Sequence, residues 1–263
     1  MVHVEYEAKD GIATITLDAP PANCYSYELM RRFDDAILKA RFDADVHALV
    51  VRSAGSKFFC AGADIGMLKA ADPAFKYNFC LHANETLLRL EQTPKIVVAA
   101  LDGHCVGGGL EIALACDLRL ARRGSGKCGL PEVRLGVLPG TGGTQRLVRT
   151  IGKARAIELM VRGETFDYDR AHALGLVHEV IDAADGPAFD AAVLDYVREL
   201  VPPKAPGRAV GFIKRACVSG AEMDLYDGLA LERELQQRLF EGADAAEGLA
   251  AYVEKRPPSF TGR

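Results

Sequence analysis

The chain has 263 residues, of which 49% are hydrophobic and 26% are charged. This composition is typical of a folded globular protein and argues against disorder, and the length allows one large domain or one domain with an appendage. Because 32 Lys and Arg residues face 36 Asp and Glu residues, the net charge is −4. That balance argues against the broad basic surface of a nucleic-acid-binding protein.

The seven cysteines are scattered and never form a C-x-x-C pair, so neither a disulfide framework nor a zinc site is expected. The first seven residues include charged side chains and lack the apolar stretch of a signal peptide, and no window holds 18 uncharged apolar residues. We therefore expect a cytoplasmic protein that has no membrane partner.

Runs rich in β-branched residues predict strands, and stretches with helical spacing of apolar residues lie between them. The predicted strands are residues 12–17, 48–52, 96–101, 118–121 and 176–181. The predicted helices of this part of the chain are residues 26–40 and 77–90. Strands that alternate with helices indicate an α/β fold.

Beyond about residue 186 the strand signals end, and three helices are predicted over residues 191–200, 209–218 and 224–240. In the last helix, four leucines lie roughly on one face, namely Leu225, Leu229, Leu235 and Leu239. This face either packs on its own chain or forms a subunit interface, and the sequence favours neither alternative.

Glycine-rich segments follow two strand-like runs. Residues 58–65 (FFCAGADI) pass from a strand-like run into small residues. Residues 101–117 (LDGHCVGGGLEIALACD) run into a glycine triplet and then a helix former. Glycines let the backbone approach a ligand closely, and the first turn of a helix offers unpaired N–H groups. Such a site suits an oxygen that becomes anionic, although a turn that only packs strand on helix has the same pattern.

Two carboxylates lie among almost wholly apolar neighbours. Glu111 follows the glycine triplet, and Glu132 stands in the third segment, residues 129–146 (GLPEVRLGVLPGTGGTQR). Each alone would be read as a surface residue. Together, beside an oxyanion site, they suit water addition or proton transfer next to a carbonyl. Burial that raises the pKa of one carboxyl would keep a proton available at neutral pH.

Other motifs are set aside. Residues 124–129 match G-x-G-x-x-G, but Pro131 stands where the phosphate-binding helix would run, so we interpret the match as accidental. Neither a P-loop nor a G-x-S-x-G serine hydrolase motif is present, and the six histidines lack the spacing of metal ligands.

The three segments, in this order, resemble the crotonase superfamily and most of all its enoyl-CoA hydratases. The similarity continues through residues 171–177 (AHALGLV) and 253–260 (VEKRPPSF), and so covers nearly the whole chain. The resemblance implies a spiral of ββα repeats in residues 1–195 that binds acyl-CoA. It also implies a helical region, residues 196–263, that forms homotrimers, often paired into hexamers.

The resemblance implies a role for several residues of the site. The N–H groups of Ala63 and Gly108 would form the oxyanion hole that holds the thioester oxygen. Glu132 would exchange the proton at C2, while Glu111 and the N–H of Gly140 would hold the water that adds at C3. The two glutamates are 21 positions apart, one more than in the familiar hydratase pattern, which indicates a one-residue insertion near residues 122–127.

The resemblance also implies where coenzyme A lies. It would run along Ala61, Gly62, Ala63, Asp64 and Ile65, near the loop of residues 20–26. Tyr25 of this loop replaces a smaller aliphatic residue and either only packs or takes part in the site, and Asp64 is expected to be structural. Residues 66–83 would line the acyl pocket. Lys255 and Phe260 resemble tail residues that reach the nucleotide in a neighbouring subunit.

The implied activity is the reversible syn addition of water to a trans-2-enoyl-CoA, which gives a 3-hydroxyacyl-CoA. Fatty-acid β-oxidation, amino-acid degradation and aromatic degradation all use this step. No metal or redox cofactor is implied, because coenzyme A is part of the substrate. The alternatives are an enoyl-CoA isomerase and a hydratase or dehydratase specialised for branched or cyclic acyl groups. Some relatives bind RNA, which the acidic balance of this chain disfavours.

Overall fold

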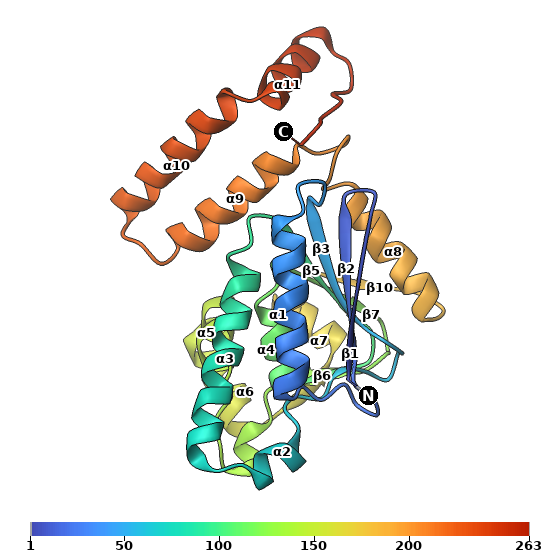
Figure 1. The fold of residues 1–263 in the computed structure, drawn as a ribbon, viewed down its shortest axis with the longest axis vertical. Coiled ribbons are helices and arrows are strands. Elements are labelled where there is room, and N and C mark those ends of the chain that lie inside the picture. Colours follow the sequence, from blue (N-terminus) through green and yellow to red (C-terminus); the bar gives the residue numbers. More distant parts are fainter. Residues whose placement is uncertain (1, 263) are drawn as a thin grey trace.

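The strands form two mixed sheets in the computed structural model, which describes residues 2–262 (Figure 1). The larger sheet has the order β1-β2-β3-β5-β7-β10. Its strands are β1 (His3–Lys9), β2 (Ile12–Asp18), β3 (Ala48–Ser53), β5 (Ile96–Leu101), β7 (Leu118–Arg122) and β10 (Glu179–Ile181). The smaller sheet has the order β4-β6-β8-β9. It contains β4 (Phe58–Cys60), β6 (His104–Val106), β8 (Lys127–Gly129) and β9 (Thr165–Asp167).

The chain winds as a spiral between these sheets. Each of the consecutive pairs β3–β4, β5–β6 and β7–β8 places its first strand in the larger sheet and its second in the smaller one. Successive turns pair in parallel in both sheets, while β1 and β9 join antiparallel and make the sheets mixed. The predicted spiral of ββα repeats is therefore confirmed.

Helices follow the strand pairs and cover the sheets (Figure 1). They are α1 (Tyr27–Phe42), α2 (Ile65–Ala70), α3 (Pro73–Glu91), α4 (Gly108–Leu114), α5 (Gly143–Ile151), α6 (Lys153–Arg162), α7 (Tyr168–Ala173) and α8 (Gly186–Arg198). A single 3₁₀ turn among residues 2–262, η1 (Glu132–Leu135), lies between β8 and α5. The predicted helices 26–40 and 77–90 are confirmed as α1 and α3.

The inner strands of the larger sheet, β2, β3, β5 and β7, are buried on both faces, which explains their continuous apolar sequences. In β3, Leu49 and Val51 belong to the hydrophobic cluster that includes α1 and α3, whereas Val50 belongs to the cluster on the opposite face. There α8 packs Phe189 and Val193 onto the sheet. Alternate residues of one strand thus serve two cores, and the sheet forms a rigid platform for the loops at its edge.

The predicted strand 176–181 is wrong in its first half. Gly175, with a φ of +76°, follows the C-terminal end of α7, and the N–H groups of Leu176 and Val177 both donate to the carbonyl of Ala171. This helix-ending turn holds the two buried residues outside the sheet, so that β10 begins only at Glu179. The strands β1, β8 and β9 were not predicted, whereas the strand-like runs before the two glycine-rich segments correspond to β4 and β6.

The G-x-G-x-x-G match at residues 124–129 is a strand connection. It joins β7 to β8, and the next element after Gly129 is the turn η1 rather than a helix. The prediction that this motif is accidental is confirmed.

Three further helices follow α8, as α9 (Gly207–Gly220), α10 (Leu225–Phe240) and α11 (Ala243–Glu254). The predicted helices 209–218 and 224–240 are confirmed, and α11 was not predicted. The helix α9 packs beside the body, whereas α10 and α11 extend away from the sheets (Figure 1). No helix within residues 2–262 combines the length and the apolar character needed to cross a membrane.

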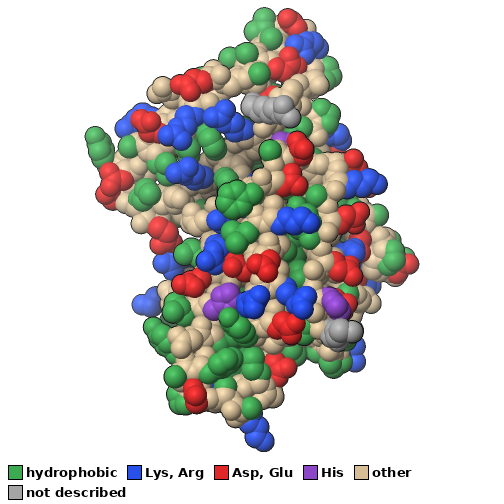
Figure 2. Space-filling model, in the orientation of Figure 1, with side chains coloured by type: hydrophobic (Ala, Val, Ile, Leu, Met, Phe, Trp, Pro, Cys, Tyr) green, Lys and Arg blue, Asp and Glu red, His purple; other side chains and the backbone are tan. Residues whose placement is uncertain are grey.

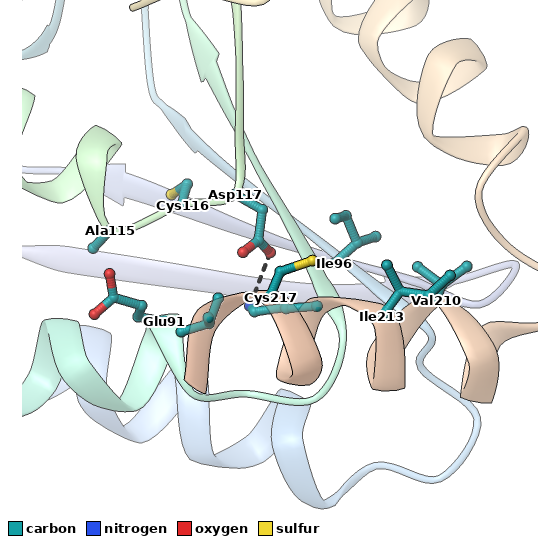
Figure 3. A pocket seen from close by; sticks show the side chains of 10 residues that line it. Glu91, Ile96, Ala115, Cys116, Asp117, Val210, Ile213 and Cys217 are labelled. Carbon is teal, nitrogen blue, oxygen red and sulfur yellow. Dashed lines mark ion pairs between the residues drawn. The ribbon is translucent and has the colours of Figure 1, made fainter. Parts of the chain in front are cut away.

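A buried ion pair fastens α9 to the body. The Nζ of Lys214 lies 2.8 Å from Oδ2 of Asp117 and 3.0 Å from the carbonyl oxygen of Lys95. The pair borders a cavity of about 400 Å³ between α9 and the ends of α3, α4 and β5 (Figure 3). Its lining includes Glu91, Ile96 and Cys116 but neither Glu111 nor Glu132. This cavity is therefore separate from the predicted site.

Candidate active site

Glu111 lies in the first turn of α4 and is buried, with 1% of its surface exposed to solvent. Its Oε1 accepts hydrogen bonds from the N–H of Thr141 at 2.8 Å and the N–H of Gly143 at 2.7 Å, and its Oε2 accepts the hydroxyl proton of Thr141. Gly143 is the first residue of α5, so the carboxylate sits at the positive end of that helix. Burial raises the pKa of Glu111, and these donors oppose that rise.

Glu132 is the first residue of η1 and is half-buried. Its Oε2 is buried without a hydrogen-bond partner among residues 2–262. Burial, aided by the nearby charge of Glu111, raises the pKa of Glu132 to about 7. A substantial fraction of this carboxyl therefore carries a proton at neutral pH. The two glutamates have different environments, as an acid and a base that act together require.

The N–H groups of Ala63 and Gly108 face no protein acceptor within the described part of the chain. Ala63 forms a parallel bridge with Tyr25, in which Tyr25 N–H donates to Gly62 and Tyr25 C=O accepts from Asp64. In such a bridge the N–H of Ala63 points away from Tyr25. Gly108 is the first residue of α4, where a helix leaves its N–H groups free.

Glycines allow the chain around Ala63, the chain around Gly108 and the side chain of Glu132 to lie close together. A Cβ added to Gly62 would lie 3.2 Å from the nitrogen of Gly108, and one added to Gly107 would lie 3.0 Å from Oε1 of Glu132. Gly62 and Gly107 also have positive φ values of +90° and +57°, which side chains rarely adopt. The structure thus brings Ala63, Gly108 and both glutamates close together.

The remaining predicted residues surround this cluster. Gly140 is half-buried and precedes Thr141, which donates two hydrogen bonds to Glu111.

The segment predicted to contact coenzyme A, residues 61–65, lies between β4 and α2. Residues 61–63 leave β4, and Ile65 is the first residue of α2 and has an exposed side chain. Asp64 caps α2, because its Oδ1 accepts the N–H of Met67 at 2.8 Å. This contact supports the structural interpretation of Asp64.

Tyr25 and Thr141 join the site in a way that the sequence did not predict. The hydroxyl of Tyr25 lies 3.0 Å from Oγ1 of Thr141, and its ring stacks on Phe79 of α3 with 5.6 Å between ring centroids. The prediction left Tyr25 open between packing and a part in the site, and it did not name Thr141. The sequence feature that could have indicated Thr141 is that a side chain with a hydroxyl group stands among the glycines of residues 140–143.

The two predicted tail residues, Lys255 and Phe260, lie just beyond the last residue of α11. Phe260 packs its ring near Gly248 of α11 and donates its N–H to the carbonyl of Pro203, and Lys255 ends α11 in the left-handed conformation. Their contact with a neighbouring nucleotide stays a prediction. Among residues 2–262, no three His, Cys, Asp or Glu side chains cluster as metal ligands would.

Comparison with known proteins gives a consistent result. The family model described as enoyl-CoA hydratase/isomerase matches residues 7–263. The mitochondrial methylglutaconyl-CoA hydratase of Rattus norvegicus is 36% identical over 262 residues, covering 99% of this chain and 82% of the relative. The short-chain-enoyl-CoA hydratase of Clostridium acetobutylicum is 33% identical over 258 residues, covering 97% and 95%.

A solved structure agrees in fold as well. The enoyl-CoA hydratase structure from Geobacillus kaustophilus HTA426 has a TM-score of 0.95 and 46% sequence identity, and the match covers 99% of this chain and 97% of the other. The fold is therefore the crotonase fold, with two mixed sheets and C-terminal helices. The chain belongs to the enoyl-CoA hydratase/isomerase, or crotonase, family.

Proposed function

We propose that this protein is an enoyl-CoA hydratase, a hydro-lyase that reversibly adds water to a trans-2-enoyl-CoA. The observation that carries the proposal is the pairing of Glu111 and Glu132 beside two backbone N–H groups without protein acceptors. The relatives with hydratase names support the same reaction.

The oxyanion hole is formed by the N–H groups of Ala63 and Gly108. They hold the thioester oxygen of the substrate, which gains negative charge as the enolate develops. Preorganised donors stabilise that charge without reorganisation during the reaction, and loss of one donor costs on the order of 10²- to 10³-fold in rate.

The two glutamates divide the proton transfers. Glu111, with the N–H of Gly140, holds the water and takes one of its protons as the hydroxyl group bonds to C3. Glu132 gives its proton to C2 on the same face, so that the addition is syn. The raised pKa of Glu132 supports its role as the acid, and the three donors to Glu111 support its role as a fixed carboxylate. Release of the proton from Glu111 and uptake of one by Glu132 restore the starting state.

Coenzyme A is proposed to lie along residues 61–65 and the loop of residues 20–26, with the acyl group toward α2 and α3. In this direction Phe75 stacks on Phe79, which stacks on Tyr25. Hydrophobic side chains also gather on the surface over α2 and the start of α3 (Figure 2). An apolar path to the site suits an acyl chain.

A second candidate is a hydratase specialised for a branched acyl group. The similarity to proteins named methylglutaconyl-CoA hydratase favours it. An isomerase is less favoured, because double-bond isomerases of this superfamily typically use only the carboxylate that corresponds to Glu132.

The proposal is tested by following the loss of the conjugated enoyl-thioester absorbance. Short, medium and branched trans-2-enoyl-CoA substrates are offered to the wild-type protein. We expect rapid hydration of at least one of them, and the ranking of rates separates the two hydratase candidates. If a folded protein that binds coenzyme A hydrates none, the proposal is wrong, and double-bond migration in 3-enoyl-CoA substrates becomes the next assay.

We also propose that residues 1–195 form the catalytic unit and residues 196–263 the oligomerisation region. The helices α10 and α11 expose large apolar side chains, among them Leu225 at 78% and Tyr252 at 86%. Of the predicted leucine face on α10, Leu235 is buried within the chain, but Leu225 and Leu229 are not. An interface with other copies would cover these residues.

Light scattering coupled to size-exclusion chromatography checks this proposal. We expect a mass three or six times that of one chain. Replacement of both Leu225 and Tyr252 by Ser is expected to lower that mass, because it removes apolar area from the interface. A monomer in the wild-type protein would contradict the proposal.

A further inference from the structure

Tyr25 touches both halves of the proposed site. Its side chain is almost fully buried, and a Cβ added to Gly108 would overlap its ring, with the ring carbon Cζ 2.6 Å away. Its backbone holds the Ala63 segment through the bridge described above. One residue therefore supports both donors of the proposed oxyanion hole.

The hydroxyl of Tyr25 reaches the other half of the site. It lies 3.0 Å from Oγ1 of Thr141, whose own hydroxyl proton is donated to Oε2 of Glu111. A threonine hydroxyl has a single proton. Since that proton goes to Glu111, Tyr25 must be the donor in its contact with Thr141. Burial raises the pKa of Tyr25 well above its ordinary value, which keeps this proton in place.

These contacts fill most of the acceptor capacity of Glu111. Oε1 accepts two backbone N–H groups, and Oε2 accepts one hydroxyl. A carboxylate oxygen has two lone-pair sites, so one site remains, on Oε2. The carboxylate cannot rotate without breaking three hydrogen bonds. The free lone pair therefore has a fixed direction.

We propose that Tyr25 and Thr141 are positioning residues that form a hydrogen-bond relay, Tyr25 to Thr141 to Glu111, and aim the free lone pair of Glu111 at the water. This inference rests on the proposed hydratase function and extends it. The relay joins the loop before α1, the turn before α5 and the helix α4, which are far apart in the sequence. It ties the water-holding carboxylate to the residue that supports the oxyanion hole.

Other groups also face Glu111. They are Arg146 of α5, Glu132 of η1, Cys60 of β4 and Cys80 of α3. The variants that test the relay leave all of these unchanged. A change in pH dependence can then be assigned to the lost hydroxyl groups.

Three variants test the relay by steady-state kinetics. Thr141→Val keeps the side-chain shape and removes the hydroxyl. We expect kcat to fall about 10- to 100-fold, as for a lost hydrogen bond to a charged group, with KM within about 3-fold. The acid limb of the kcat/KM profile should move to higher pH, because the carboxylate loses a donor. Thr141→Ser, which restores the hydroxyl, should recover most of the loss, and Tyr25→Phe should reduce kcat by a smaller factor.

The double variant Tyr25→Phe/Thr141→Val separates a relay from two independent contacts. We expect it to be no slower than Thr141→Val alone, because Tyr25 acts only through Thr141. Thr150→Val, on the exposed side of α5, is the matched control and should leave the kinetics unchanged. A wild-type kcat and pH profile for Thr141→Val, or multiplicative losses in the double variant, would overturn the inference.

An unfolding experiment separates failure of the relay from failure of the proposed function. Urea unfolding of the same single and double variants gives a coupling that does not depend on activity. We expect the effects of the two substitutions on the unfolding equilibrium constant to differ from additivity by about 3- to 10-fold. An inactive wild-type protein would refute the hydratase proposal, whereas absence of coupling would refute the relay alone.

Discussion

Glu132→Gln is expected to lower kcat for hydration by roughly 10²-fold or more, because glutamine keeps the shape of the side chain but cannot give a proton to C2. In the wild-type protein, kcat/KM should fall as pH rises through about 7, where Glu132 loses its proton. The residual activity of the variant should lack this limb. Enoyl-thioester absorbance, followed between pH 5 and pH 9, measures both effects.

Stability shows whether this loss comes from unfolding. The pKa of Glu132 is raised from 4.5 to about 7 in the folded protein. As pH rises between these values, the unfolded chain loses the proton first, so the wild-type protein loses stability over this window. Glutamine has no such charge. Urea unfolding at pH 8 should therefore find the variant at least as stable as the wild type. A large destabilisation would show that the carboxylate of Glu132 is stabilised in the folded protein, and would contradict its raised pKa.

Glu111→Gln gives the comparison that identifies the reaction. A hydratase that uses both carboxylates should lose a similar factor in either variant, whereas an isomerase should tolerate Glu111→Gln far better. Glu234→Gln, on the exposed surface of α10, is the matched control and should leave the rate unchanged. Full activity of Glu132→Gln would exclude its proposed role as the acid.

Much of the fold could be predicted because the inner strands of the larger sheet are buried on both faces. Val97 and Val98 in β5 pack into different clusters, so the strand is apolar throughout and easy to recognise. The strand β1 was missed because it lies at the sheet edge and carries charged residues between its apolar ones. The short strands of the smaller sheet have three residues each, too few for a period to appear.

The candidate site was predictable in part for a similar reason. Glu111 stands two residues after its glycine triplet, so a local pattern places it in the first turn of a helix. The partner of Tyr25 is 116 positions away in the sequence, and the contact of Thr141 with Glu111 spans 30 positions. No local period encodes such contacts. They arise from the spiral, which brings the loop before α1 beside the turn before α5.

Gly108→Ala is expected to lower kcat by about 10²- to 10³-fold, as for the loss of one oxyanion donor. The backbone of Gly108 does not have a positive φ, so the harm comes from space rather than from backbone strain. The new methyl group would overlap the ring of Tyr25, and either that ring or the N–H of Gly108 must move. Hydration kinetics and coenzyme A binding, measured side by side, should find kcat reduced more than affinity.

Two controls identify the cause of that loss. Gly228→Ala in α10 places its Cβ at an ordinary contact distance of 3.6 Å from the carbonyl of Gly220 and should leave the rate unchanged. Removal of the ring should remove the clash, so Gly108→Ala/Tyr25→Ala should be no slower than Tyr25→Ala alone. If the double variant is slower by the full factor of Gly108→Ala, the methyl group acts on the substrate directly. The position of the oxyanion donor would then not depend on Tyr25.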